Sequence, residues 1–272
     1  MKIAFIGGGN MASALIAGLI NRGVSSADLC AFDPNDDVRE RNAQLLGIAT
    51  AAAPDAGIAD FDAIVLAVKP QIVRDVATSL APLISANQLV ISVVAGIRSV
   101  DLSRWLQGHT RIVRTMPNTP ALIGKGVTGL AATAGVDECS RTLATQVLDS
   151  AGRTVWVDDE SKIDAVTAIS GSGPAYVFYF IEALQDAALQ LGLDETQARE
   201  LALATFAGAA ELATQSREPA SVLRERVTSK GGTTAAALDS FNSSGIKAAI
   251  VKGALAAHSR AIEMGEEFGK SA

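Results

Sequence analysis

The feature that most constrains the fold is a short apolar run that leads through three glycines into a helical pattern, 3-IAFIGGGNMASA-14. In the spacing Gly7-x-Gly9-x-x-Ala12, the glycines suit a tight turn from strand to helix, and the alanine suits close packing of that helix on a sheet. The first N–H groups of such a helix favour a bound phosphate. The motif predicts dinucleotide binding, and a purely structural turn is the alternative. The residues expected to contact the cofactor here are Ile6, Gly7, Gly8, Gly9, Asn10, Met11 and Ala12.

Short apolar runs alternate with helix-length patterns up to about residue 157. Strands are expected at 2–7, 29–33, 63–68, 89–95, 111–116 and 153–157, and helices between them at 10–23, 34–47 and 70–84. Several of the runs are apolar at every position, as expected for parallel strands whose two faces are both covered by helices. This alternation predicts an α/β fold in which residues 1–160 form a Rossmann-like, doubly wound parallel sheet domain.

After about residue 160 only helical patterns follow. Helices are expected at 174–192, 194–216, 219–227, 233–241 and 246–268, the first of them starting at Ser172 or Gly173 with Pro174 in its first turn. Their small apolar residues cover much of the helix circumference. We expect residues 161–272 to form an all-helical domain that buries this surface against a second copy of the chain.

Composition narrows the classes of partner. A length of 272 residues suits two domains, and a net charge of -6 without runs of Lys or Arg predicts no nucleic-acid or anionic-membrane partner. No apolar run reaches the roughly 18 residues of a membrane span. Cys30 and Cys139 stand alone, with neither the density of a disulfide scaffold nor the spacing of a metal site. We therefore expect a cytoplasmic protein with small-molecule partners and no metal.

The acid at the end of the second expected strand bears on which cofactor binds. Asp33 could accept a hydrogen bond from a ribose 2′-OH, which favours NADH, and would repel the 2′-phosphate of NADPH. It could equally cap the helix that follows. Arg39 and Arg41 come within two turns and could soften the repulsion. The choice between NADH and NADPH stays open at this point.

Loops after other expected strands should meet at the same edge of the sheet, where α/β proteins bind ligands. We expect cofactor contacts from Ala95, from Asn118 between its two flanking prolines, and from the stretch Ala67, Val68, Lys69 and Pro70. A plain turn or a solvated loop lysine is the alternative at each of these places.

A second glycine cluster, 229-SKGGTT-234, lies in the helical half. Its glycines let the backbone bend, and the N–H groups of Gly232, Thr233 and Thr234 would open the next helix and suit a carboxylate or a phosphate. A simple helix cap is the alternative. His109 and His258 have no motif around them, so we expect the chemistry to lie in the cofactor.

Five segments in order, 5-FIGGGNMA-12, 67-AVKPQ-71, 116-MPNTPAL-122, 170-SGSGPAY-176 and 227-VTSKGGTTAAALD-239, resemble the pyrroline-5-carboxylate reductase family. The resemblance covers nearly the whole chain, and its last segment is the most specific. It implies that the chain reduces 1-pyrroline-5-carboxylate to L-proline with NADPH or NADH, the last step of proline biosynthesis.

The resemblance also implies roles for residues of the second cluster. The Ser229 hydroxyl and the N–H groups of Gly232, Thr233 and Thr234 would hold the substrate carboxylate. The Thr234 hydroxyl would face the ring nitrogen, which makes Thr234 the expected catalytic residue. The helical domains would pair into homodimers, which in this family often assemble further into decamers, with Ser229 to Thr234 of one chain over the nicotinamide bound by the other.

The sequence departs from the family at one position, and two other functions are possible alternatives. Asp33 stands where members that use NADPH often carry small or hydroxyl residues, so we expect activity with both cofactors. A β-hydroxyacid dehydrogenase would need a catalytic lysine in the helical half, but Lys162 lacks that family's glycine-rich surroundings and Lys230 lies in the glycine loop. If the chain were a non-catalytic NAD(P)-binding protein, the segment 229-SKGGTT-234 would have no function.

Overall fold

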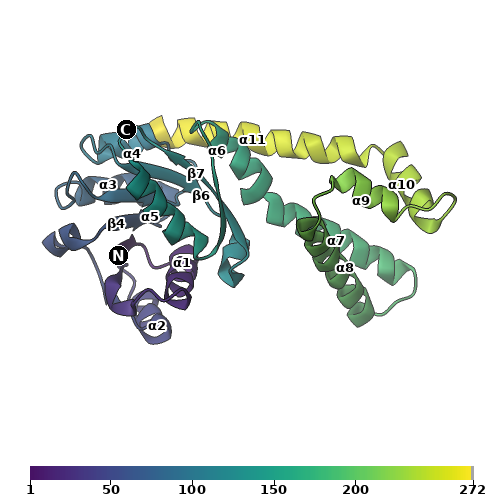
Figure 1. Ribbon diagram of the computed structural model, residues 1–272, viewed down its shortest axis with the longest axis horizontal. Helices are drawn as coiled ribbons and strands as arrows, with labels where there is room; N and C mark the ends of the chain where they lie inside the picture. Colours follow the sequence, from purple (N-terminus) through teal and green to yellow (C-terminus); the bar gives the residue numbers. More distant parts are fainter. Residues whose placement is uncertain (271–272) are drawn as a thin grey trace. The chain divides into compact units, whose positions relative to one another are not determined.

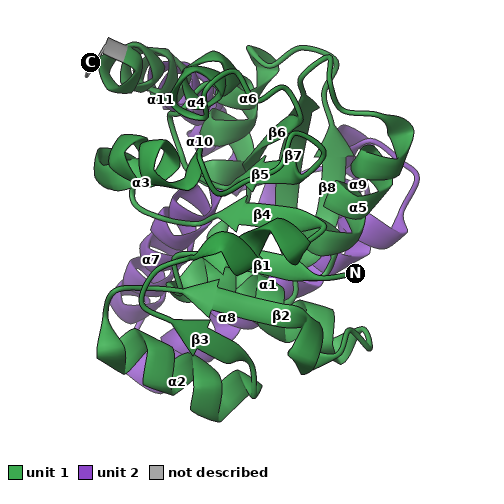
Figure 2. Cartoon of the chain, turned by 90° about the vertical axis from the view of Figure 1, so that its left-hand side faces the viewer, with its two compact units in different colours: residues 1–172, 257–272 green, residues 173–256 purple. Residues whose placement is uncertain are grey.

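The computed structural model describes residues 1–270, which fall into two compact units (Figure 2). The first unit comprises Met1–Ser172 together with the chain from Ala257 onward, and the second comprises Gly173–Ala256. Residues 161–172 thus group with the first unit. The division of functions at residue 160 stays a prediction.

An eight-stranded sheet forms the centre of the first unit (Figure 1). The strands are β1 (Ile3–Ile6), β2 (Leu29–Phe32), β3 (Ala49–Ala51), β4 (Ala63–Leu66), β5 (Leu89–Ser92), β6 (Ile112–Met116), β7 (Gly126–Ala132) and β8 (Gly152–Trp156). They lie in the order β3-β2-β1-β4-β5-β6-β7-β8, and every neighbouring pair is parallel except β6 and β7. The expected Rossmann-like sheet is confirmed, with a single antiparallel pair inside it.

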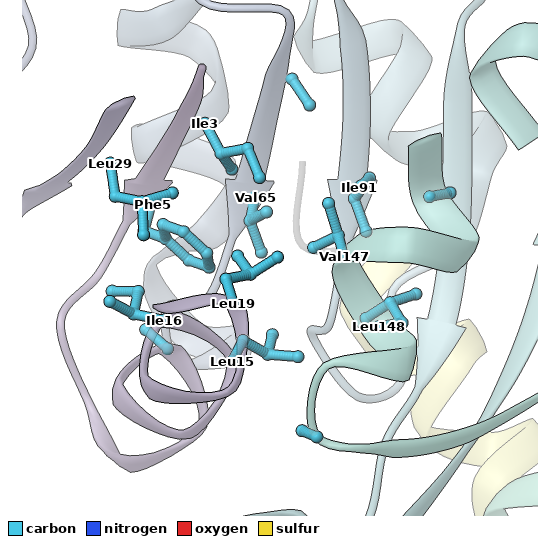
Figure 3. Close-up of a cluster of buried hydrophobic side chains, with 14 of the residues drawn as sticks. Ile3, Phe5, Leu15, Ile16, Leu19, Leu29, Val65, Ile91, Val147 and Leu148 are labelled. Atoms are coloured by element: carbon cyan, nitrogen blue, oxygen red, sulfur yellow. The ribbon is translucent and has the colours of Figure 1, made fainter. Parts of the chain in front are cut away.

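Helices cover both faces of this sheet, which explains why its central strands are apolar throughout. The helices are α1 (Asn10–Asn21), α2 (Asp36–Leu46), α3 (Val73–Leu80), α4 (Ser99–Trp105), α5 (Glu138–Asp149) and α6 (Lys162–Val166). Odd-numbered residues of β1, such as Phe5, pack with α1 and α5, whereas even-numbered ones, such as Ile6, pack with α3 and α4. In Figure 3 the side chains of Leu15 and Val147 reach toward the sheet from α1 and α5. Burial on both faces keeps the carboxyl ends of the strands in a fixed array.

The second unit contains only helices. They are α7 (Gly173–Gln190), α8 (Glu195–Gln215), α9 (Ala220–Arg226), α10 (Thr233–Ser243) and the first part of α11 (Ile246–Lys270). Asp194 and Gln197 form a capping box that fixes the start of α8. Among residues 173–256, all of which are described, the fully buried apolar residues are Ala198 and Ala202. The expected all-helical arrangement is confirmed, and this unit has almost no core of its own.

The helix α7 begins at Gly173, as expected, but the chain that leads into it was not expected to be helical. The chain is helical from α6 through a π-helical turn at Thr167–Gly171 into α7, so neither Ser172 nor Gly173 is an extended cap residue. Pro174 has no N–H to offer the carbonyl of Ser170. That carbonyl instead accepts a hydrogen bond from Asn118 Nδ2 at 3.1 Å. The proline therefore lies in the first turn of α7, as expected, directly after an irregular π-helical turn.

Within residues 1–270, no helix has both the length and the apolar character that crossing a lipid bilayer requires.

Candidate functional site

The glycine loop after β1 lies at the point where the order of the strands reverses. β1 pairs with β2 on one side and with β4 on the other, so the loops after β1 and β4 are neighbours. Gly7 has a φ of +98°, and a Cβ placed on it would lie 2.5 Å from the carbonyl oxygen of Ala67. Only glycine fits both the conformation and the space. The loop is therefore held directly over the crevice where dinucleotides bind in this type of sheet.

Gly9 and the start of α1 leave room for an anion. A Cβ placed on Gly9 would meet nothing within 4 Å, in contrast to Gly7. Gly9 is the N-cap of α1 and supplies no side-chain hydrogen bond to the first N–H groups of the helix. Asn10 is exposed, whereas Ala12 is fully buried against the sheet. Open space in front of an uncapped helix start is what a pyrophosphate requires, so these residues fit a dinucleotide.

Polar side chains that follow β2 or lie in α2 hold the backbone of Gly8. The carboxylate of Asp33 accepts a hydrogen bond from Gly8 N–H at 2.8 Å, and Asn42 Nδ2 donates to Gly8 O at 2.9 Å. Ser13 Oγ donates to Asn42 Oδ1 at 2.8 Å, which fixes the amide. Ser13 and Asn42 were not predicted from the sequence. Asn42 lies among the charged residues of α2, and its burial, at 2% exposure, has no signal in that pattern.

The other predicted cofactor residues lie where the sheet topology requires. Ala67 and Val68 are partly buried directly after β4, and Lys69 is exposed just before the 3₁₀ turn that Pro70 begins. Ala95 is partly buried in the loop after β5. Because β4 and β5 run parallel to β1, these loops share its carboxyl edge. The contacts with a cofactor themselves stay a prediction.

Asn118 follows β6 at the same edge, and its amide has two partners within the protein. Oδ1 accepts from Val127 N–H at 2.9 Å, while Nδ2 donates to Ser170 O. The side chain is 9% exposed. In this structure Asn118 thus ties the loop after β6 to β7 and to the π-helical turn.

The second glycine cluster forms a tight turn followed by a helix start in the helical unit. Gly232 N–H donates to Ser229 O at 3.0 Å, and Gly231 has a φ of +73° inside this turn. Gly232 is the N-cap of α10 and gives no side-chain cap, so the N–H groups of Thr233 and Thr234 lack an intrahelical acceptor. A Cβ on Gly232 would lie 2.6 Å from Ser229 Oγ. The hydroxyl of Ser229 therefore lies beside the open helix start.

This geometry changes one detail of the expected carboxylate site. Gly232 was expected to present its N–H to the carboxylate, but that N–H is engaged in the turn with Ser229. Gly232 shapes the turn, and the donors left at the helix start are the N–H groups of Thr233 and Thr234. Thr234 itself is half-buried, whereas Ser229 and Thr233 are exposed.

Two titratable groups away from these loops, His109 and Lys162, have hydrogen-bond partners of their own. His109 is 8% exposed, and its Nε2–H donates to the carbonyl oxygen of Gln88 at 3.0 Å. The pKa of Lys162 is raised, chiefly by its hydrogen bond to Asp158, which keeps this amine protonated at neutral pH. Among the residues that the structure describes, no three His, Cys, Asp or Glu side chains gather as metal ligands would.

Family models match both parts of the chain. Residues 160–264 match a model described as pyrroline-5-carboxylate reductase dimerisation. Residues 2–96 match one described as coenzyme F420-dependent NADP oxidoreductase.

Individual relatives extend the match to the whole chain. A pyrroline-5-carboxylate reductase from Pseudomonas aeruginosa is 44% identical over 269 residues, which cover 99% of this chain and 98% of the relative. A solved pyrroline-5-carboxylate reductase from Coxiella burnetii superposes with a TM-score of 0.92 at 38% identity, covering 97% of this chain and 98% of that one. The Plasmodium falciparum enzyme, solved with NADP bound, has a TM-score of 0.85 at 30% identity, with coverage of 97% and 98%.

Proposed function

Because the chain belongs to the pyrroline-5-carboxylate reductase family, we propose that it reduces 1-pyrroline-5-carboxylate to L-proline with NADPH or NADH, the last step of proline biosynthesis. The observation that carries the proposal is the uncapped start of α10, with Ser229 Oγ beside it and the Thr234 side chain half-buried next to it. A protein that only bound a dinucleotide would have no use for this second site.

The first unit supplies the dinucleotide site. NAD(P)H, when bound, supplies a hydride for the carbon of a C=N bond. Gly7 sets the turn, Gly9 leaves the space, and the N–H groups at the start of α1 face it. Ala67 to Pro70, Ala95 and Asp33 border the same edge of the sheet and complete the proposed cofactor site.

The loop Ser229 to Thr234 supplies the proposed substrate site. The N–H groups of Thr233 and Thr234 and the Ser229 hydroxyl hold the carboxylate, and Gly232 keeps the turn open. The Thr234 hydroxyl hydrogen-bonds the ring nitrogen, which becomes an amine during the reaction. Since an imine protonates readily, positioning and one polar partner suffice, and no strongly acidic side chain is required.

Assembly of the chain completes this proposal. The chain forms homo-oligomers through its helical unit, since that region matches the family's dimerisation model. We propose a dimer as the basic assembly, in which the loop of one subunit lies over the nicotinamide bound by the other, and a decamer as the further assembly of these dimers. A cytoplasmic location is proposed because Cys30 and Cys139 are both free thiols.

Thr234→Val tests the assigned role of the threonine hydroxyl. Valine keeps the shape of the side chain and removes its hydrogen bond to the ring nitrogen. We expect kcat/KM for the cyclic imine to fall by about tenfold to a thousandfold, the range for losing one positioned polar group. The measurement is oxidation of NADPH followed by its absorbance with pyrroline-5-carboxylate.

The same substitution at Thr142 is the matched control. Thr142 is exposed on α5, where its hydroxyl donates to Glu138 O within the helix, so Thr142→Val should leave kcat/KM unchanged. Equal kinetics for Thr234→Val and the unsubstituted protein would reduce the loop to a helix cap. Turnover of 3-hydroxy acids in place of the imine would instead favour a β-hydroxyacid dehydrogenase.

A further inference from the structure

The carboxylate of Asp33 makes hydrogen bonds within the protein that its position in the sequence does not reveal. Both carboxylate oxygens accept backbone hydrogen bonds: Oδ2 from Gly8 N–H at 2.8 Å and Oδ1 from Asn35 N–H at 3.0 Å. The side chain is half-buried between the glycine loop and the turn into α2. A carboxylate that holds two amides of its own backbone is first of all a structural tie between these two loops.

The Gly8 peptide is the common partner in this arrangement. Its N–H is held by Asp33, and its carbonyl oxygen accepts from Asn42 Nδ2 and from Arg41 Nη2 at 3.1 Å. A Cβ on Gly8 would lie 2.6 Å from Asn42 Nδ2, so the peptide packs closely on α2. The position of the cofactor loop therefore depends on the first two turns of α2.

The two arginines of α2 differ in how much of their charge is already neutralised. Arg39 donates through Nη1 to the carbonyl oxygen of Asp33 at 2.7 Å and pairs through Nη2 with Asp36. Arg41 donates one hydrogen bond to Gly8 O and forms no ion pair with any residue in 1–270. Its side chain is exposed beside the loop, with four N–H donors still available.

The 2′ position of a bound adenosine ribose comes to the end of the second strand in this fold, and an arginine there accommodates a 2′-phosphate. We propose that Arg41 is the specificity-determining residue that binds the 2′-phosphate of NADPH, while Asp33 is a positioning residue for the Gly8 peptide. Asp33 then does not exclude NADPH, because both of its carboxylate oxygens accept hydrogen bonds from backbone amides and Arg39 and Arg41 lie close to it in α2. This inference rests on the dinucleotide site of the proposed function but not on the identity of the imine.

Two adenosine nucleotides that differ in one phosphate test the role of Arg41. The full-length protein is titrated by calorimetry, without cofactor or substrate, with adenosine 2′,5′-bisphosphate and with adenosine 5′-monophosphate. Arg41→Gln should raise the Kd of the bisphosphate at least tenfold and change that of the monophosphate less than threefold, because a guanidinium binds phosphate through paired hydrogen bonds. The KM of NADPH should rise with the Kd of the bisphosphate, and that of NADH should not.

Arg22→Gln is the matched control, since Arg22 is exposed at the opposite end of α1 from the glycine loop. It should leave both nucleotide affinities unchanged. An equal effect of Arg41→Gln on the two nucleotides, or no effect on either, would overturn the assignment. Binding of these fragments requires no turnover, so a protein that reduced another substrate would still give the predicted pattern.

The positioning role of Asp33 has its own readouts. Asp33→Ala should weaken both nucleotides by a similar factor and lower the Tm of the ligand-free protein, because the Gly8 peptide loses its tie. Asp33→Asn keeps an oxygen that can accept from Gly8 N–H and should recover most of both losses. If Asp33 instead accepted a hydrogen bond from the ribose, Asp33→Ala would weaken only the binding of the monophosphate and would leave the Tm of the ligand-free protein unchanged. That result would refute the positioning role.

Discussion

At the scale of single residues, we expect substitution of Gly7 and of Gly9 by alanine to have opposite effects on stability and binding, although both glycines belong to one motif. Gly7→Ala forces a side chain into a φ of +98° and against Ala67 O, so we expect a loss of at least about 1–3 kcal/mol in unfolding free energy. Gly9→Ala meets no atom within 4 Å and should leave the unfolding free energy nearly unchanged while weakening dinucleotide binding. Urea unfolding and a fluorescence titration with NADPH separate the two. Equal stability of the two variants would contradict the packing described for Gly7.

His109 gives a prediction for pH. Burial lowers the pKa of this imidazole below its ordinary value of 6.5, so the unfolded chain takes up the proton first as the pH falls. Stability from the neutral ring is therefore complete above about pH 6.5 and declines below it, with a slope of up to about 1.4 kcal/mol per pH unit. His109→Gln should flatten the fall in unfolding free energy between pH 6.5 and 5. An unchanged profile would exclude His109 as its source.

Residue roles could be predicted only where backbone geometry dictates them. The role of Gly7 in the first loop could be predicted because no other residue fits the turn. The roles of Ser229 to Thr234 were predicted from the family resemblance. For Asp33 the sequence allowed two roles, an acceptor for the ribose and a cap for the next helix. Its two amide partners lie in different segments of the chain, 25 and two positions away, and spacing alone cannot pair the more distant of them. The engagement of Gly232 N–H in a turn was likewise invisible in the sequence.

At the scale of elements, the contact of α6 with the sheet depends on a buried ion pair. Arg114 on β6 is 3% exposed and donates to Asp164 Oδ1 on α6 at 2.9 Å. Asp164→Ala would leave the guanidinium buried with only the longer contact to Glu160, at 3.3 Å. We expect a loss of about 3–5 kcal/mol in unfolding free energy, measured by urea denaturation.

The pair Lys162 and Asp158 beside α6 is the control. Both side chains are more than half exposed, so Asp158→Ala should hardly change the stability, because water already solvates the two charges. Comparable losses for Asp158→Ala and Asp164→Ala would show that burial does not decide the strength of the Arg114 contact.

Some elements could not be predicted because tertiary contacts create them. β7 contains two glycines and two alanines in GVTGLAA, which makes it a poor strand by propensity. Neighbouring residues leave no room for a side chain at these glycines. A Cβ on Gly129, for example, would lie 2.6 Å from Val166 Cγ1 of α6. The three-residue β3 and the helices α4 and α5 were also missed, whereas the long apolar strands and the helices of the C-terminal half were found by their periodicity.

At the scale of the whole molecule, the exposed apolar surface of the helical unit allows the proposed dimer to be tested. Apolar side chains line a groove between Tyr179 and Phe180 of α7 and Ile250 of α11, and Gly253 adds no side chain to it. Ile250→Glu places a charge on this surface and should shift the protein toward a monomer, as measured by light scattering after size exclusion. Leu45→Glu, on an exposed apolar residue of α2, should leave the mass unchanged. A monomeric mass for the unsubstituted protein would refute the proposed dimer.

The return of α11 to the first unit has a consequence for synthesis of the chain. Phe268 packs on the core beneath α3 and α4, and Arg104 Nη2 donates to Gly269 O at 3.0 Å. The dinucleotide unit thus contains residues from both ends of the polypeptide. A ribosome that has made the first 172 residues has not yet released all of that unit, so its folding is completed only after the helical unit has been translated. Nascent chains stalled before residue 257 should accordingly be more sensitive to protease than finished ones.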